Sequence, residues 1–196
     1  MKYTLLLVAT LFFSFTLVTD DPIDWIGVKG PVEFNKISFE LVWSGKPKPN
    51  YFVQKYLFEG EKLESFNQML TFSVFTTDIK PGDAVKQKVK ELENRKKTDT
   101  LCNYNVTESP DHKESMIAFL QAETKNNKMA LVEFNASRYQ QIKINSKKKV
   151  LYVFSYSVRS YGDSIAPFLK TLKDKRVEYL NLMMAAYLPE INLGRK

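Results

Sequence analysis

One segment near the middle of the chain, residues 116–122, is apolar at nearly every position. Successive side chains of a strand point to opposite faces of its sheet, and here both alternating sets are apolar. Those sets are Met116, Ala118 and Leu120 on one side, and Ile117 and Phe119 on the other. A strand of this kind needs cover on both faces, which predicts a sheet between two further layers.

Other segments show the two-residue alternation of apolar and polar residues and the β-branched content that are typical of strands. Residues 36–43 alternate cleanly, and the turn after them carries two prolines and a glycine, which exclude regular pairing. The segment before them, 20–34, is interpreted as a lead-in or a short edge strand. The predicted strands are residues 36–43, 51–58, 69–77, 101–108, 114–123, 128–144 and 149–160.

Two segments change to the period of a helix. In the first, 76–99, apolar residues at helical spacing form a narrow stripe, and Pro81 or Asp83 stands near the start. The second, 164–188, has a broad apolar face, Asp163 or Ser164 as a candidate cap and Pro167 in the first turn. The predicted face consists of Ile165, Phe168, Leu169, Leu172, Leu180, Met183, Met184 and Tyr187.

The predicted order is three strands, a helix, four strands and a helix, joined by short connections that make sequential strands neighbours. This gives an α+β domain with a single, largely antiparallel sheet of about six to seven strands and helices on both faces. The arrangement resembles the PsbP/Mog1-type fold in its element order. That resemblance implies an architecture and carries no function.

Residues 1–19 have the features of a signal peptide. One positive charge at Lys2 precedes an uncharged, mostly apolar stretch of 16 residues, and Asp20 and Asp21 follow. A membrane span needs about 20 apolar residues, so cleavage is favoured over retention as an anchor. We expect a mature domain of residues 20–196, exported to the periplasm or the cell exterior, that is not an integral membrane protein. Cys102 is the only cysteine, so no internal disulfide can form.

The chain is basic, with a formal net charge of +7. Loss of Lys2 with the leader leaves 28 basic and 22 acidic side chains, a net charge of +6. This balance favours an anionic envelope component or an unknown protein as partner. The basic side chains gather on the first helix, from Lys86 to Lys97, and on the turn Lys147 to Lys149. Neither set interleaves aromatic residues for base stacking, so no nucleic acid is expected.

Few residues offer chemistry. His112 is the only histidine and stands in a polar turn, which excludes a two-histidine metal site and predicts a solvated loop residue. Cys102 is expected to be a buried strand residue. The sequence has no Gly-x-Ser-x-Gly, phosphate-binding or dinucleotide-binding motif. We therefore predict no catalytic residue, metal or cofactor, and favour a non-enzymatic protein while leaving an enzyme open.

The corner between the second and third strands holds the nearest thing to a polar cluster. Glu59, Glu61 and Glu64 could serve an envelope hydrolase if they flanked a cleft, but carboxylates at a turn are usually solvated. Asn67 and Gln68 have no evident structural role. The candidate binding residues are Glu61, Asn67, Gln68, Lys147, Lys148 and Lys149.

The same corner is similar to a recurrent segment in exported bacterial proteins to which no activity or ligand is attached. Tryptophan often stands there at the position of Phe66, and a proline often precedes the glycine. The matching residues are Tyr56, Leu57, Gly60, Glu61, Phe66, Met69, Leu70 and Thr71. The resemblance implies export and architecture alone.

The leading hypothesis is an exported, soluble binding or interaction domain of the periplasm or cell envelope. The alternatives are a hydrolase that uses the carboxylates near Glu61, and a peripheral membrane-surface protein that uses the basic helix and turn.

Overall fold

The computed structural model describes residues 21–144 and 148–193. The predicted leader, 1–19, and Lys147 lie outside the described residues.

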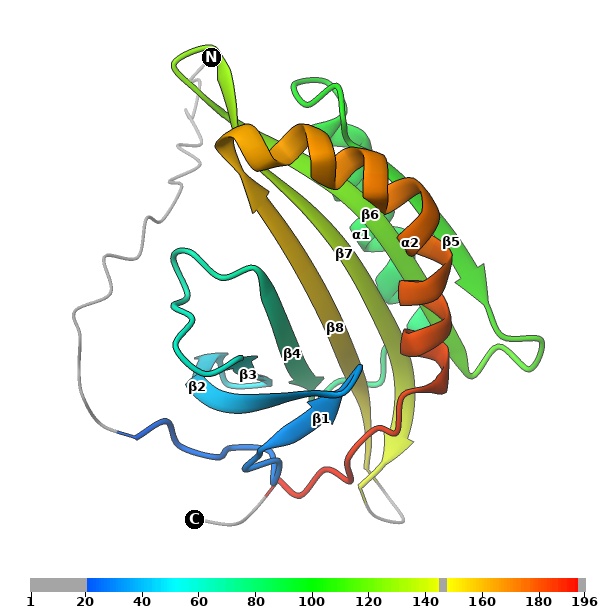
Figure 1. The fold of residues 1–196 in the computed structure, drawn as a ribbon. Coiled ribbons are helices and arrows are strands. Elements are labelled where there is room, and N and C mark those ends of the chain that lie inside the picture. The colour runs from blue at the N-terminus through cyan, green and yellow to red at the C-terminus, as the bar shows by residue number, and fades with distance from the viewer. Residues whose placement is uncertain (1–20, 145–147, 194–196) are drawn as a thin grey trace, which may run out of the picture.

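Eight strands form one open antiparallel sheet (Figure 1). The spatial order is β1-β2-β3-β4-β8-β7-β6-β5, so a single long connection, through α1, separates β4 from its sequence successor. The strands are β1 (Val32–Phe34), β2 (Ile37–Lys48), β3 (Tyr51–Leu57), β4 (Gln68–Phe75), β5 (Asn103–Glu108), β6 (Glu114–Lys125), β7 (Lys128–Lys143) and β8 (Lys149–Tyr161). The α+β class and antiparallel pairing are confirmed. The strand count is corrected from six or seven to eight, because the lead-in segment contributes β1 at the edge.

The predicted two-sided burial of β6 is confirmed. Met116, Ala118 and Leu120 belong to the main hydrophobic core, whereas Ile117 and Phe119 belong to a second core on the opposite face. The strand lies next to the edge of the sheet, and one helix packs against each of its faces.

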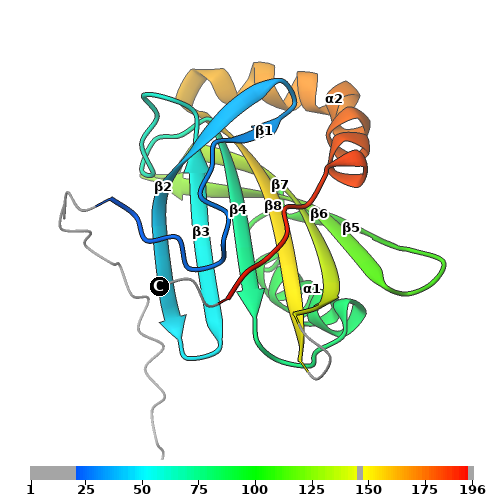
Figure 2. The same ribbon diagram turned by 90° about the horizontal axis from the view of Figure 1, so that it is seen from below.

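The helices α1 (Pro81–Arg95) and α2 (Ile165–Ala185) pack on opposite faces of the sheet (Figure 2). Val85 and Leu92 of α1 contact the second core over β5, β6 and β7. Ile165, Leu172 and Met183 of α2 contact the main core over β7 and β8.

The helix ends differ in part from the prediction. Pro81 occupies the first turn of α1, as predicted. Ser164 precedes α2, but neither it nor Asp163 makes a capping side-chain bond, because a 3-10 turn at Gly162–Ser164 leads directly into the helix. Met184 and Tyr187 are 52% and 83% exposed, contrary to the predicted face. The helix ends at Ala185 and Ala186 is extended, so Tyr187 leaves the apolar stripe.

The segment before β1 is fixed to the main-core face by one buried amide. The Gln54 side chain accepts hydrogen bonds from the backbone N–H groups of Trp25 and Ile26, at 2.7 and 3.0 Å, and donates to Val28 O at 3.0 Å. This segment and the chain after α2 meet through Asn192 N and Ile26 O, and both cross the sheet on the side opposite α1 (Figure 2).

Arg138 on β7 closes the C-terminal end of α2. Its Nη1 donates to the carbonyl oxygens of Met184 and Ala186, both at 3.1 Å, and its Nε and Nη2 bind the Glu114 carboxylate at 2.8 and 3.0 Å. The last carbonyls of a helix have no partner inside the helix and carry negative partial charge. This guanidinium therefore fixes the end of α2 to the sheet.

Arg138→Gln should lower the free energy of unfolding by about 2–3 kcal/mol, because it removes charge-assisted bonds and leaves Glu114 without its cation. Chemical denaturation measures the change. Lys173→Gln on the exposed side of α2 is the matched control and should be neutral. Equal stability of the two variants would contradict the role of Arg138.

Candidate functional site

The face of the sheet that carries α1 is only partly covered. The helix packs mainly on β5, β6 and β7, so it only flanks the same face of β4 and β8. Small polar side chains line a cavity of about 670 Å³ there, which we call the hydroxyl groove. The polar residues of its floor are Thr71, Ser73, Asn135, Ser137, Ser155 and Ser157, and Met69, Leu151 and Val153 of the same strands also line it.

The strand register places these floor residues in one patch. Thr71 is paired with Ser155, which is paired on its other side with Ser137, so one row of hydroxyls crosses three strands. Alternate residues of each strand share a face, so the floor side chains lie opposite the aromatic residues of the main core, such as Phe72 and Phe154.

The floor side chains bind one another. Ser137 Oγ and Ser155 Oγ lie 2.8 Å apart, and Ser157 donates to Asn135 Oδ1 at 2.7 Å. Thr71 makes no side-chain hydrogen bond to any residue of the described ranges. Each paired hydroxyl keeps unused capacity, because a hydroxyl offers one donor and two acceptor sites. The floor can therefore bond further polar groups.

The walls of the groove are aromatic and charged. Tyr51 and Phe75 stack with ring centroids 4.3 Å apart, and Tyr139 and Phe119 also line the cavity. Helix α1 contributes Gln87, Lys88 and Glu91, and the two charges form an ion pair at 3.0 Å.

A buried carboxylate stands at one end of the floor. Glu133 is 6% exposed and accepts hydrogen bonds from Gln121 Nε2 at 3.1 Å, from Asn135 Nδ2 at 2.8 Å and from Arg159 Nε. The network is connected to the floor because Asn135 also accepts from Ser157. Glu133 thus accepts three side-chain hydrogen bonds, two at Oε1 and one at Oε2.

Lys55 is the second cation at this end. It lies on β3, paired with Thr71, and its Nζ lies 5.2 Å from the ring centroid of Trp43. Burial lowers the pKa of Lys55, and Arg159 lowers it further while Glu133 opposes the shift. Within the part of the chain that the structure describes, the Lys55 ammonium makes no ion pair with a carboxylate.

The loop between β3 and β4 packs beside the same end. Phe66 is buried with Leu57 and Met69, the Arg159 guanidinium lies 3.9 Å from the Phe66 ring centroid, and Tyr161 donates to Phe66 O at 2.8 Å. Gly60 makes the turn with a φ of 81°, a conformation that glycine adopts readily.

Three of the predicted binding residues fix this loop. Glu61 accepts hydrogen bonds from the Asn67 N–H and from Asn67 Nδ2, at 2.9 and 3.0 Å, while Gln68 Oε1 accepts from the Tyr156 hydroxyl at 2.6 Å. The structure thus brings Glu61, Asn67 and Gln68 together, next to the groove rather than in its lining.

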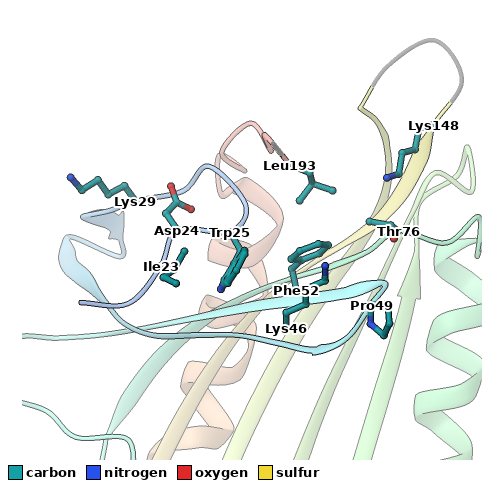
Figure 3. Close-up of a pocket in the computed structure, with 10 residues that line it drawn as sticks. All are labelled: Ile23, Asp24, Trp25, Lys29, Lys46, Pro49, Phe52, Thr76, Lys148 and Leu193. Carbon is teal, nitrogen blue, oxygen red and sulfur yellow. The ribbon is translucent and has the colours of Figure 1, made fainter. Parts of the chain in front are cut away.

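The other predicted residues lie elsewhere. Lys149 is exposed at the start of β8, and Lys148 lines a second hollow of about 1040 Å³, which we call the terminal cavity (Figure 3). Trp25, Phe52 and Leu193 gather around this hollow, and Lys29 also belongs to its lining. The nearby Asp24 carboxylate is engaged by the backbone N–H groups of Gly27 and Val28 at 2.8 and 2.9 Å.

The remaining reactive groups are dispersed. Glu59 and Glu64 are exposed on the loop. Cys102 is buried, with its thiol pKa raised by that burial, and it precedes β5, whereas His112 lies in the turn after β5. A six-residue strand separates them by about 20 Å. Among the described residues, no group of three or more His, Cys, Asp or Glu side chains is placed to hold a metal ion.

The basic side chains of α1 are largely paired. Lys86, Lys88 and Lys96 form ion pairs with Asp83, Glu91 and Glu93, at 3.3, 3.0 and 2.8 Å.

The hydroxyl groove was missed from sequence, although a signal is present. In the alternating set of β4 and β8 that faces the groove, the central polar residues Thr71, Ser73, Ser155 and Ser157 are small and uncharged, while Lys149 and Arg159 of the same set in β8 lie outside this central run. A solvent-facing set usually contains Lys, Glu or Arg. Small hydroxyls in consecutive positions of one face therefore distinguish a lined hollow from an exposed surface.

A protein-family model matches residues 26–188, which include both helices and all eight strands. The chain belongs to that family. The family match brings no ligand, activity or partner with it. No curated protein and no solved structure matches the chain, so the likeness to the PsbP/Mog1-type fold stays a prediction. No helix within 21–144 and 148–193 is long and apolar enough to cross a membrane.

Glu61→Ala should loosen the β3–β4 loop, since it removes the acceptor for two Asn67 donors. We expect faster amide exchange at Asn67 and Gln68 and a loss of about 1 kcal/mol in the free energy of unfolding. Hydrogen exchange and denaturation measure these changes. Glu59→Ala, two residues away and exposed, should change neither; identical exchange in both variants would show that Glu61 does not fix the loop.

Lys55→Met should raise the free energy of unfolding at neutral pH. The lowered pKa means that the folded state disfavours the charged ammonium. Between the folded-state pKa and 10.5, the folded chain has lost this proton while the unfolded chain still holds it, so the stability of the wild type rises with pH in that range. The advantage of the variant should therefore shrink as pH approaches 10.5. Denaturation at pH 7 and pH 10 tests this, and a destabilised variant at pH 7 would contradict it.

Proposed function

We propose that the protein is an exported, non-enzymatic binding domain that holds a small polar ligand in the hydroxyl groove. The observation that carries this proposal is the row of Thr71, Ser155 and Ser137, which lines a cavity at the centre of a sheet face.

Stability alone does not account for this floor. Ser137 and Ser157 are 6% and 5% exposed, and a buried hydroxyl stabilises a fold less than an apolar side chain of similar size. A second helix over apolar residues would be the ordinary way to finish this face, as on β6. A concave, mostly pre-formed site with a few convergent polar groups is the usual form of a ligand pocket.

The site favours binding over catalysis. Glu133 is held by three donors, and its nearest floor neighbours are amide and hydroxyl groups rather than a nucleophile with a base. The rival hydrolase near Glu61 has less support, because Glu61 is engaged by Asn67. The membrane-surface alternative is weakened in the same way, because three lysines of α1 are paired with carboxylates.

Export to the periplasm or cell exterior and a mature domain of residues 20–196 belong to the same proposal. They rest on the signal-peptide features of residues 1–19, and an anionic envelope component is the partner class that the net charge of +6 favours. A sandwich of the PsbP/Mog1 type is supported by the packing of α1 and α2 on opposite faces.

Thr71→Phe tests the site, because the phenyl ring would fill the groove while the threonine side chain that it replaces makes no hydrogen bond to a described residue. The matched control is Thr107→Phe on the exposed edge strand β5. Thermal shifts would be measured with a panel of monosaccharides, sugar acids, amino acids and nucleosides. We expect a class of compound that stabilises the wild type and Thr107→Phe but not Thr71→Phe. Equal stabilisation of all three proteins, or no stabilising compound, would contradict the proposal.

A further inference from the structure

Resting on the proposed function, the geometry points to the class of ligand. We propose that the hydroxyl groove takes an acidic sugar, a polyhydroxylated ring with a single carboxylate, and that the carboxylate pairs with Lys55 while the ring hydroxyls bond the floor.

The charge at this end of the groove is unbalanced by one. Lys55 and Arg159 supply two positive charges, and Glu133 supplies one negative charge that binds Arg159 directly. Lys55 is half-buried, and within the described residues its ammonium lies over the Trp43 ring and makes no ion pair. Buried or partly buried charges are normally paired, so a half-buried lysine that makes no ion pair within the described residues and is the strand neighbour of Thr71 in the groove floor marks a place for an anion. An excess of one charge matches a carboxylate better than a doubly charged phosphate monoester.

The position of Lys55 suits a ligand that also touches the floor. Its Cα is paired with that of Thr71, which begins the row that continues through Ser155 to Ser137. A carboxylate at Lys55 would thus have the body of its molecule over these hydroxyls.

The floor favours a sugar body over a peptide. Sugar hydroxyls both donate and accept, as do Ser and Thr, so the two sets can pair without a fixed donor pattern. Aromatic walls at Tyr139 and Phe119 offer apolar surface to the C–H faces of a ring, and about 670 Å³ holds one or two sugar units.

Trp43 gives this site its own optical reporter. A Cβ on Gly45 would lie 2.6 Å from Trp43 Cη2, so the absence of a side chain at Gly45 lets the indole lie over that residue, and Lys55 Nζ lies 5.2 Å from the centroid of the ring. The only other tryptophan, Trp25, lines the terminal cavity. In a Trp25→Phe background, the fluorescence therefore reports on the Lys55 end alone.

The test is a fluorescence titration of the Trp25→Phe protein with D-galacturonate and with D-galactose at constant ionic strength. These probes differ only in the carboxylate. We expect galacturonate to bind more tightly, and Lys55→Met to weaken it about 10–100-fold while leaving galactose unchanged. Lys128→Met, an exposed lysine of the β6–β7 hairpin, is the control and should bind as the parent does.

The contrary outcomes separate the two claims. Equal binding of both sugars, or unchanged galacturonate binding by Lys55→Met, would overturn the acidic-sugar inference. The proposal of a binding domain would still be supported if Thr71→Phe abolished ligand binding. If other compounds of the panel bound but neither galacturonate nor galactose did, the acidic-sugar inference would likewise be overturned and the binding-domain proposal would stand. Loss of galactose and galacturonate binding together in Lys55→Met would also overturn the assigned role of Lys55, provided that denaturation shows the variant folded.

Discussion

The two-sided burial of β6 is the constraint on which the rest of the structure depends. Ile117 and Phe119 require a helix on one face, and Met116, Ala118 and Leu120 require cover on the other. The helix α1 supplies the first, and because a single helix is only about 10 Å wide, it packs mainly on β5, β6 and β7. The site follows from this limited cover, because α1 flanks the same face of the middle strands β4 and β8 and leaves a cavity over them.

The uncovered face is then finished by polar groups and by one loop. Small serine and threonine side chains occupy the centre of this face. At one end Glu133 accepts hydrogen bonds from three side chains, and the β3–β4 loop places Phe66 against Arg159. The loop itself depends on Glu61 and Gly60. A segment that looked like an isolated polar corner thus acts as the support of the charged end of the groove.

The sequence predicted most of the fold because its elements have strong periods. The alternation in β2 and β4, the doubled alternation in β6 and the helical spacing in α2 each identified their elements. The brief strand β1 was harder to assign, since three residues give no period. The groove depends on register across β3, β4, β8 and β7, which joins Lys55, Thr71, Ser155 and Ser137 from positions far apart in the chain. Local patterns carry no information about that pairing, so the site residues could not be assembled from them.

The central claim is that the hydroxyl groove, and not the terminal cavity, is the ligand site. The most direct measurement is amide chemical-shift mapping by NMR during a titration with D-galacturonate. The account predicts shifts that cluster at Thr71, Ser73, Ser155 and Ser157, with Trp25 and Phe52 unmoved. Saturable shifts that cluster at Trp25 and Phe52 instead would contradict it.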